Sequence, residues 1–368
     1  MLQREKLESL LAVNLYKGIN PKSWHGAARA ILEDEFIPKN RPLKAIWDPQ
    51  EEDYKIDSSM REGRPHTSPD GQCAICLGNT TAILMENGTT DTPFINLNLF
   101  PMRYPEGTLV ETYKGFKAPV DYIVGGSFLQ WHTTEHKEIH QLTYEQYLNN
   151  LLQLAEFENC LGERIDFNGL SYQAFVDIFK NVGKNAGRSI PHGHHQFQFS
   201  NIRSPKIRRD IESLLDAGEA FIDYTENINK NLKVLEYDRA IAYSLYKSSV
   251  PFEIVVSPKQ SVERIKDMDN DTLRDLAMAI VDVSRGLYHL MPEERLNFAY
   301  NACFHTGLGI GKMYVRFKPK SQIYAGSEEL DVHILQKSPQ TCADMFRQKL
   351  PLIKGMHPDE YKLEPEMA

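Results

Sequence analysis

Residues 192–199 constrain this chain more than any other stretch, because they read His-Gly-His-His-Gln-Phe-Gln-Phe. In a β-strand, alternate side chains point to the same face of the sheet. One face would then carry two imidazoles and two amides, those of His192, His194, Gln196 and Gln198. The other face would be largely apolar. A polar face backed by an apolar one predicts a functional site built on a sheet.

A glycine-rich segment comes just before this strand, where residues 181–189 read Asn-Val-Gly-Lys-Asn-Ala-Gly-Arg-Ser. Two glycines, small polar residues and two cations can wrap backbone N–H groups around phosphate oxygens. A neutral imidazole has a free lone pair near pH 7, so an imidazole beside such a loop could attack an α-phosphorus. Gln196 could then donate to the phosphoryl oxygens as charge develops.

The alternative for residues 181–199 is a histidine-rich strand edge without chemistry. A single histidine would favour that interpretation. Two alternating histidines, a glutamine and a glycine-rich loop together favour a site. His195 falls on the apolar face and is expected to be a packed or solvated residue rather than a catalyst.

Cys73 and Cys76 are separated by two residues, a spacing that lets two thiolates reach one metal ion. By itself this pair is as consistent with two small core residues as with half of a metal site. A redox pair is disfavoured, because no thioredoxin-like strand–helix–strand pattern follows it.

The composition excludes some classes of partner. With 42 Lys and Arg against 50 Asp and Glu, the net charge of −8 gives no electrostatic reason to expect nucleic-acid binding. No apolar run approaches the roughly 18–20 residues needed to span a bilayer, so no membrane partner is expected. The first twenty residues have no signal-peptide core, and five cysteines are an odd and sparse set. Both features favour a reducing compartment, and the cytoplasm is the expected location.

Hydrophobic periodicity predicts the order strand, loop, helix and strands twice, offset by roughly 130 residues. Mostly antiparallel strands with interspersed helices favour an α+β fold over a parallel sheet. A stretch rich in Pro, Asp, Glu and Lys, residues 37–71, is expected to be irregular. The expected helices are 143–157 and 270–290, and the expected strands are 94–100, 120–124, 176–181, 251–256, 297–304 and 312–318.

The spacing of Asn181, Ser189, His192, His194 and Gln196 resembles the active-site signature of the galactose-1-phosphate uridylyltransferases, a branch of the histidine-triad superfamily. That signature reads Asn-x-Gly and then Gly-x-Ser-x-x-His-x-His-x-Gln, and this chain matches every position. The resemblance implies a histidine-triad-like fold, with two related halves of antiparallel sheet and flanking helices.

The resemblance also implies boundaries along the chain. We expect an N-terminal arm at residues 1–72, a half that carries zinc and the catalytic histidine at 73–205, and a second half at 206–368.

In the family the second histidine of the signature is the nucleophile, which here is His194. It would attack the α-phosphorus of an NDP-sugar and release sugar 1-phosphate. A second sugar 1-phosphate would then collect the nucleotidyl group in a ping-pong cycle. Gln196 would bind phosphoryl oxygens as the second catalytic residue. The expected substrate-binding residues are Asn181, Gly187, Arg188 and Ser189.

Two other functions stay open. Phosphorylases that act on NDP-hexoses or dinucleoside polyphosphates share the His-x-His-x-Gln motif and use inorganic phosphate as the acceptor. A non-enzymatic binding protein is the third possibility, and the intact His194 and Gln196 count against it. The resemblance suggests a homodimer. The nucleotide base and the sugar are not fixed by the sequence.

The resemblance further implies one structural zinc per chain, held by Cys73, Cys76, His136 and His192. Four protein ligands leave no open position on the metal. The spacing from His136 to the following Leu-Thr is one residue shorter than the family leads one to expect. Two other histidines, His132 and His140, therefore remain alternatives as the third ligand.

Three departures from the family pattern limit what is carried over. No Arg-rich, Trp-containing strand motif precedes Cys73, so the base is undetermined. Residues 313–317 contain no histidine where the family often has a second metal site, so no second metal is expected. Gln322 stands near the position of a family lysine, so the acceptor need not be galactose 1-phosphate. Arg316, Lys318 and Lys320 alternate along an expected strand and could face either a sugar phosphate or solvent.

Overall fold

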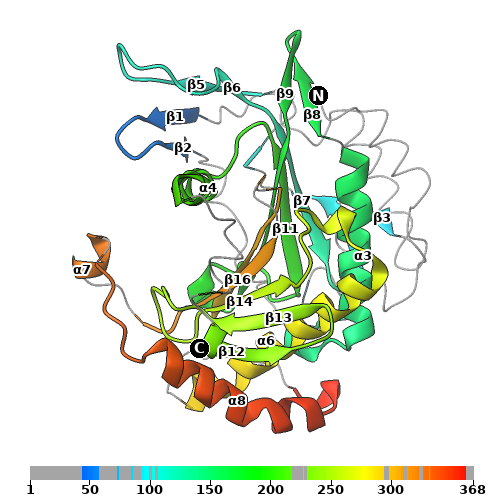
Figure 1. The fold of residues 1–368 in the computed structure, drawn as a ribbon. Helices are drawn as coiled ribbons and strands as arrows, with labels where there is room; N and C mark the ends of the chain where they lie inside the picture. The colour runs from blue at the N-terminus through cyan, green and yellow to red at the C-terminus, as the bar shows by residue number, and fades with distance from the viewer. Residues whose placement is uncertain are drawn as a thin grey trace.

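The structure is a computed structural model, and it describes residues 44–57, 73, 84–85, 93–98, 102–103, 107–133, 135–161, 163–217, 227, 230–293, 298–307, 309, 313–322, 326–330 and 332–361. A sheet of ten strands forms its centre, and neighbouring strands are antiparallel throughout (Figure 1). In order across the sheet, the strands are β12 (Lys233–Glu236), β13 (Ala240–Ser244), β14 (Ile254–Pro258), β16 (Tyr314–Pro319), β15 (Tyr300–His305), β10 (Phe175–Val182), β11 (His194–Ser200), β7 (Gly125–Trp131), β4 (Phe94–Leu97) and β3 (Leu84–Met85).

Two sets of elements with the same chain order meet at the middle of this sheet. The first set is β7, α3 (Tyr144–Leu161), β10 and β11, and the second is β14, α6 (Asn270–Glu293), β15 and β16. Across the sheet, β14-β16-β15 is followed by β10-β11-β7, so the second order mirrors the first. The expected α+β fold, with two related halves of antiparallel sheet, is confirmed. The domain boundaries remain a prediction.

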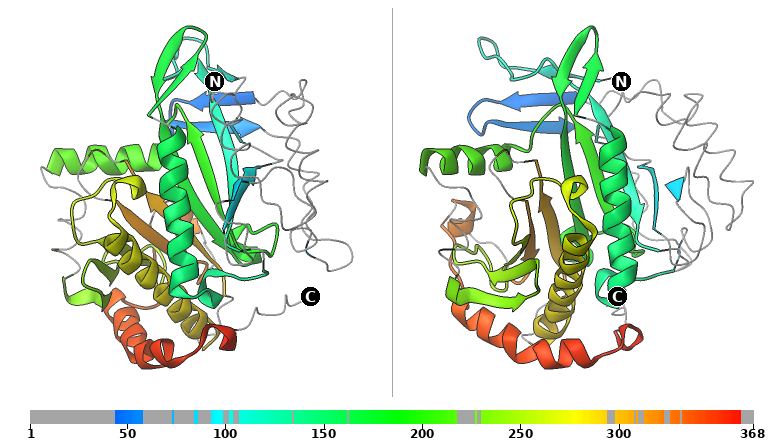
Figure 2. Two further views of the ribbon diagram at one scale, coloured as in Figure 1. Left: turned by 90° about the vertical axis from the view of Figure 1, so that its right-hand side faces the viewer. Right: turned by 45° about the vertical axis from the view of Figure 1, so that its right-hand side comes forward.

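Helices α3 and α6 contact each other and lie on one side of the sheet, as Figure 2 shows, and α8 (Pro339–Gly355) packs on α6. The start of α3 follows from its sequence. Thr143 Oγ1 accepts from the N–H of Gln146 at 3.0 Å, and Gln146 Oε1 accepts from the N–H of Thr143 at 3.0 Å. This reciprocal capping box satisfies two donors that the first helical turn leaves unpaired. The expected helices 143–157 and 270–290 are both present, each slightly longer than expected.

A hairpin at residues 44–57 corrects the expectation that 37–71 is irregular. It consists of β1 (Lys44–Asp48) and β2 (Asp53–Asp57), and it joins β5 (Thr108–Glu111) and β6 (Tyr122–Ile123) in a second sheet of order β2-β1-β5-β6. Alternate residues of β1 are buried in a small separate core, which explains why a charged segment forms a strand here. Residues 37–43 and 58–71 lie outside the described residues.

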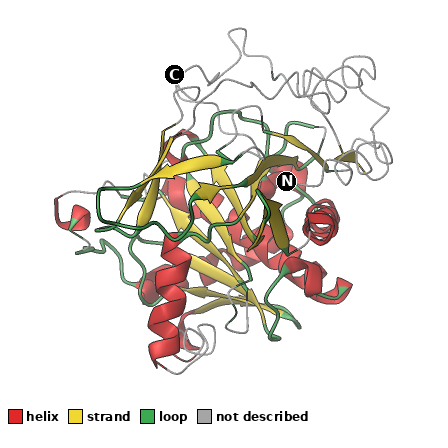
Figure 3. Ribbon diagram, turned by 90° about the horizontal axis from the view of Figure 1, so that it is seen from above, coloured by secondary structure: helices red, strands yellow, loops and turns green. Residues whose placement is uncertain are grey.

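The remaining described elements surround these two sheets (Figure 3). These remaining elements are the hairpin β8 (Arg164–Phe167) and β9 (Leu170–Gln173), helices α4 (Pro205–Ala217) and α7 (Gly326–Glu329), and the 3-10 turns η2 (Ile139–Gln141), η3 (Lys184–Ala186), η4 (Lys230–Leu232), η5 (Ile265–Asp267) and η6 (Pro358–Glu360).

Among the described residues, none of the helices combines the length and apolar character that a membrane span requires.

Candidate active site and metal-ligand cluster

His194 is the first residue of β11, between β10 and β7 in the sheet. Its ring Nδ1 lies 2.8 Å from the backbone carbonyl oxygen of His192, and the side chain is 3% exposed. A carbonyl oxygen only accepts hydrogen bonds, so this contact requires a proton on Nδ1. In the neutral ring, the lone pair then resides on Nε2, which is the nitrogen available for nucleophilic attack.

The surroundings of His194 also keep its ring neutral. Burial lowers the pKa of His194 to about 3, and the positive charge of Lys180 acts in the same direction. A ring with so low a pKa carries no proton on Nε2 at neutral pH. The imidazole is therefore held in the tautomer and the charge state that a nucleophile needs.

The two faces of β11 divide as the sequence predicts. Phe197 and Phe199 belong to the main hydrophobic core, while Gln196 lies two residues along the strand from His194 and so shares its face. His195, on the core side, is fully buried and bonds through Nε2 to Tyr147 Oη (3.1 Å) and through Nδ1 to Gln130 Oε1 (3.0 Å). His195 is thus a packed, hydrogen-bonded residue, as expected.

The glycine-rich segment between β10 and β11, residues 183–189, is called the phosphate loop below. Gly183 and Gly187 flank the turn η3 with φ values of 78° and 81°. A side chain is strained at such φ values, and a Cβ at Gly183 would also lie 2.5 Å from the Phe298 carbonyl oxygen. The Ser189 hydroxyl is buried, and it finds no hydrogen-bond partner within the described part of the chain. A buried hydroxyl in that state suits a ligand oxygen.

Asn181 is placed by a residue that the sequence did not single out. Its Oδ1 accepts from Asn301 Nδ2 at 2.8 Å, and the same nitrogen donates to the Ala186 carbonyl oxygen at 3.0 Å. Asn301 belongs to β15, which pairs with β10 at the junction of the two halves. The second half of the chain therefore positions the phosphate loop of the first half.

Steric constraints require a glycine at position 193, between His192 and His194. A Cβ at this position would lie 2.0 Å from the Lys137 carbonyl oxygen and 2.7 Å from His132 Nδ1. The backbone N–H of His132 also donates to the Gly193 carbonyl oxygen at 3.0 Å. Only glycine lets the strand that carries His194 approach residues 132–137 this closely.

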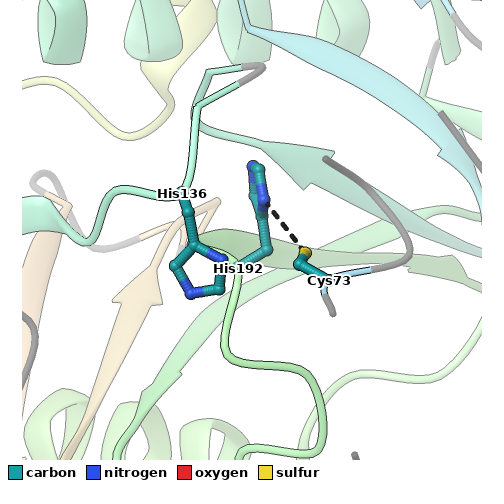
Figure 4. A group of neighbouring side chains, drawn as sticks. All are labelled: Cys73, His136 and His192. Atoms are coloured by element: carbon teal, nitrogen blue, oxygen red, sulfur yellow. Dashed lines mark hydrogen bonds between the residues drawn. The ribbon is translucent and has the colours of Figure 1, made fainter. Parts of the chain in front are cut away.

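Cys73, His136 and His192 bring their ligand atoms within 4.8 Å of one another (Figure 4). Cys73 Sγ is 3.5 Å from His192 Nδ1, and His192 Nε2 lies 2.8 Å from the Thr133 carbonyl oxygen. The proton on Nε2 that this carbonyl requires leaves the Nδ1 lone pair facing the thiol. Tetrahedral zinc places a thiolate sulfur and an imidazole nitrogen about 3.6 Å apart, so the donor set fits that ion.

The structure also distinguishes the three histidines that were considered as the third ligand. His136 is in the cluster with Cys73 and His192. The His132 ring instead packs on that of His195, at 4.7 Å between ring centroids, and the His140 ring stacks on that of Tyr288 at 4.8 Å. Cys76 lies outside the described residues.

Two buried residues near the site, on the core face of the sheet opposite His194, escaped the sequence analysis. Lys180 Nζ lies 2.6 Å from Glu138 Oε2, and both side chains are buried. Glu138 Oε1 also faces Arg188 Nη1 at 3.5 Å. Burial acts to raise the pKa of Glu138, but the charges of Lys180 and Arg188 outweigh it and lower that pKa. The sequence held one signal, because strand alternation puts Lys180 on the apolar side of β10, with Ile178 and Val182.

Of the alternating basic residues expected on the strand 312–318 and just after it, Arg316 has an acidic partner in the structure. Arg316 forms an ion pair with the buried Glu253, which is also bonded by the N–H of Ser249 at 2.7 Å. Lys318 is level with Asn301 on the neighbouring strand. The structure does not bring Arg316 into contact with His194 among the interactions of the described residues.

Comparisons with known proteins agree with the fold. No family model matches the chain. A galactose-1-phosphate uridylyltransferase of Haemophilus influenzae is 28% identical over 162 residues, which span 42% of this chain and 45% of that protein. The Thermotoga maritima enzyme of the same name is 23% identical over 68% of this chain and 78% of its own length. An ADP-glucose phosphorylase of Arabidopsis thaliana is 26% identical over 36% of this chain and 37% of that protein.

Solved structures give the same result over more of the chain. A uridylyltransferase structure covers 83% of this chain and 97% of its own, with a TM-score of 0.68 and 19% identity. The Arabidopsis thaliana ADP-glucose phosphorylase with bound ADP-glucose covers 83% and 98%, with a TM-score of 0.59 and 16% identity. These structures share the fold, whereas the Haemophilus influenzae protein is matched over less than half of its length.

Proposed function

We propose that this protein transfers a nucleotidyl group from an NDP-sugar to a sugar 1-phosphate. Its fold and its sequence are similar to those of the galactose-1-phosphate uridylyltransferase-like branch of the histidine-triad superfamily. The observation that carries the proposal is the 2.8 Å contact between His194 Nδ1 and the His192 carbonyl oxygen. It keeps the proton on Nδ1 and so leaves the lone pair on Nε2, at the start of the strand that follows the phosphate loop.

The reaction takes two displacements at one phosphorus. His194 Nε2 attacks the α-phosphorus, an N–P bond forms, and the bond from that phosphorus to the bridging oxygen breaks, so that sugar 1-phosphate leaves with the electron pair. A phosphate oxygen of the acceptor then attacks the same phosphorus. The N–P bond breaks and returns the lone pair to His194, which is ready for another cycle. Two displacements of this kind define ping-pong kinetics.

The neighbouring groups have roles in this scheme that their positions support. Gln196 shares the face of His194 and would donate from its amide to phosphoryl oxygens. The buried Ser189 hydroxyl and the loop residues Gly187 and Arg188 would hold the diphosphate. Asn181 would help to place the phosphates, held in turn by Asn301.

We further propose that Cys73, His136 and His192, together with Cys76, hold one structural zinc per chain. When bound, the ion would cross-link the segment before α3 to the strand that carries His194. A full set of protein ligands leaves no coordination position for substrate. The homodimer and the cytoplasmic location remain predictions.

A second function is favoured by one observation, the similarity to the Arabidopsis thaliana ADP-glucose phosphorylase. That function would use the same nucleophile, with inorganic phosphate as the acceptor. The two are separated by incubating the protein with UDP-, GDP- or ADP-glucose, with phosphate or with sugar 1-phosphates. Product formed only with phosphate assigns the phosphorylase activity, and product formed only with a sugar 1-phosphate assigns the transferase activity.

The nucleophile itself is tested by trapping. Wild-type protein given an NDP-sugar labelled at the α-phosphorus should retain acid-labile, base-stable label, whereas His194→Ala should not. Equal labelling of both proteins would remove His194 from this role.

A further inference from the structure

The face of the sheet that carries His194 continues along the strands to a second polar group. Gln198 follows Gln196 by two residues on β11, so it lies on the same face. Asp177 is directly opposite Gln198 on β10, and alternation along β10 puts it on the face of Asn181. The side chains of Asp177 and Gln198 are therefore neighbours, about 13 Å along the strands from His194.

A third polar side chain, that of Arg103, reaches this place from a segment that crosses the face. The backbone N–H of Met102 donates to Ser127 Oγ at 3.1 Å, and Ser127 is directly opposite Gln198 on β7. Met102 Sδ also lies 4.0 Å from Gln198 Nε2. This segment thus lies over the row of side chains that contains Asp177, and the charge of Arg103 acts on that carboxylate. Arg103, Asp177 and Gln198 are called the Asp177 cluster below.

The protein itself leaves the polar groups of the Asp177 cluster poorly satisfied. The partly buried Asp177 carboxylate has no hydrogen bond or ion pair with another described residue. Gln198 is 5% exposed, and within the described chain its amide contacts only the weak thioether acceptor of Met102. The buried Nε of Arg103 also lacks a hydrogen-bond partner in the part of the chain that the structure describes. Buried polar groups normally have partners, so these three suit a ligand.

The charge state of Asp177 limits what this ligand can be. Burial raises the pKa of Asp177 to about 6, because the charges of Arg103 and Arg203 only partly offset the loss of solvation. The carboxylate is therefore mostly ionised at neutral pH, where it accepts hydrogen bonds and cannot donate them. A carboxylate kept at a cost in stability, on the face of a proposed site, indicates a binding role.

The ligand should offer two adjacent donors to the carboxylate and an acceptor to the neighbouring amide. Guanine has this pattern, because its N1–H and its N2 amino group lie side by side and its O6 acceptor is next to them. In adenine and cytosine the amino group stands beside a ring nitrogen that only accepts, and in uracil the N3–H lies between two carbonyl oxygens. A carboxylate would face an acceptor in each of these three bases, which disfavours them.

We propose that the Asp177 cluster binds the guanine of a GDP-sugar, with Asp177 accepting from N1–H and the N2 amino group and Gln198 donating to O6. Arg103 supplies a further donor on the same face. The place along β11 fits this assignment, since the base lies beyond the ribose from an α-phosphorus at His194. This inference rests on the proposed function, because that function puts the α-phosphorus of a nucleotide at His194.

Exchanging guanine for xanthine tests the contact to Asp177. Xanthine has a carbonyl oxygen in place of the N2 amino group, and the amide introduced by Asp177→Asn can donate to that oxygen. In titration calorimetry at neutral pH, wild-type protein should bind GDP roughly 10- to 100-fold more tightly than xanthosine 5′-diphosphate (XDP), the range for a bidentate contact to a base. Asp177→Asn should reverse this preference. Asp177→Ala, the matched control, should weaken GDP binding without improving XDP binding.

Gln198 gives an independent test, because guanine and xanthine both carry O6. Gln198→Ala should weaken the binding of GDP and XDP by the same factor and so keep the preference for GDP. Asp282 is a buried carboxylate on α6 that accepts from Tyr144 Oη at 2.7 Å. Asp282→Asn should lower the thermal midpoint without changing the preference between the two nucleotides.

A structural role for Asp177 would change the two Kd values together. An Asp177→Asn protein that keeps the preference for GDP overturns the proposal, and so does a wild-type protein that binds GDP no more tightly than XDP, UDP or ADP. Failure of the proposed function appears separately, as a reversed preference in Asp177→Asn with no label on His194 of wild-type protein given GDP-glucose labelled at the α-phosphorus. Label on His194 without the reversal removes the guanine contact alone.

Discussion

The two halves of the main sheet build similar loops but complete them differently. Between β10 and β11, Gly183 and Gly187 have positive φ, and the buried Ser189 hydroxyl lacks a partner among the described residues. In the described part of the connection between β15 and β16, Gly307 and Gly309 also have positive φ. There, however, the Gly309 N–H donates to a carboxylate oxygen of Glu263 at 3.2 Å.

The strands that follow these loops differ in the same way. On β11 the neutral, buried His194 and Gln196 face the phosphate loop side of the sheet. On β16 the cation of Arg316 is paired with the buried carboxylate of Glu253. In the second half, the Gly309 N–H and the Arg316 cation are both paired with carboxylates, whereas in the first half the Ser189 hydroxyl has no partner among the described residues. For this reason we place the proposed site in the first half.

Replacing the proposed nucleophile should give the largest difference between the two halves. His194→Ala should lower the rate of nucleotidyl transfer by roughly 10⁴-fold or more, the scale seen when a covalent nucleophile is removed. Tyr314→Phe, on the corresponding strand of the second half, should change the rate less than about 10-fold, because no step of the reaction is assigned to it. Steady-state rates with the preferred NDP-sugar measure both. A comparable loss in the two variants would mean that both halves contribute to chemistry.

Metal content should give the next largest difference between the two halves. His136→Asn should reduce bound zinc well below one per chain and lower the free energy of unfolding by roughly 4 kcal/mol, in the range for loss of a structural metal. His305→Asn, on β15 of the second half, should keep its zinc. Elemental analysis of washed protein and chemical denaturation give the two values. Zinc loss from His305→Asn, or two zinc ions in the wild-type protein, would contradict a single site in the first half.

Sequence patterns revealed the local parts of this architecture. Alternation in residues 192–199 correctly separated the two faces of β11, and the Thr143–Gln146 spacing correctly placed the start of α3. Periods of two and 3.6 residues report on burial within one element, and for that reason these predictions succeeded. The hairpin at 44–57 was missed, because its apolar residues are few and its composition is that of a loop.

Contacts between segments that are distant in the sequence could not be predicted from sequence patterns. Asn181 meets Asn301 only because β10 pairs with β15 at the junction of the halves, and no local pattern reports that pairing. The pairing of Lys180 with Glu138 likewise depends on how the segment before α3 folds back over β10. Family resemblance supplied the histidine cluster but could not choose among the three histidines, because the choice depends on the path of residues 132–140.

The two halves also differ in how much room a glycine leaves for an added Cβ atom. Gly193→Ala places a methyl group 2.0 Å from the Lys137 carbonyl oxygen and should lower the free energy of unfolding by about 3 kcal/mol through overpacking. Gly309→Ala meets no atom within 4 Å and should cost about 1 kcal/mol, from its positive φ alone. Urea denaturation measures both. Equal costs would show that the close approach at Gly193 is relieved by movement of residues 132–137.

A pH-dependent effect is expected at Asp177, on β10 beside the junction of the halves. Burial raises the pKa of Asp177 to about 6, although Arg103 and Arg203 oppose this shift. A raised folded-state pKa means that the unfolded chain loses this proton first. Ionisation of Asp177 therefore costs stability as pH rises from about 4 to 6, and the full cost is present above that window. Asp177→Asn should remove this dependence, so the variant should gain up to about 3 kcal/mol relative to wild type between pH 4 and pH 7. Denaturation at several pH values measures the difference, and a constant difference across this range would place an ionised, well-solvated carboxylate at the junction.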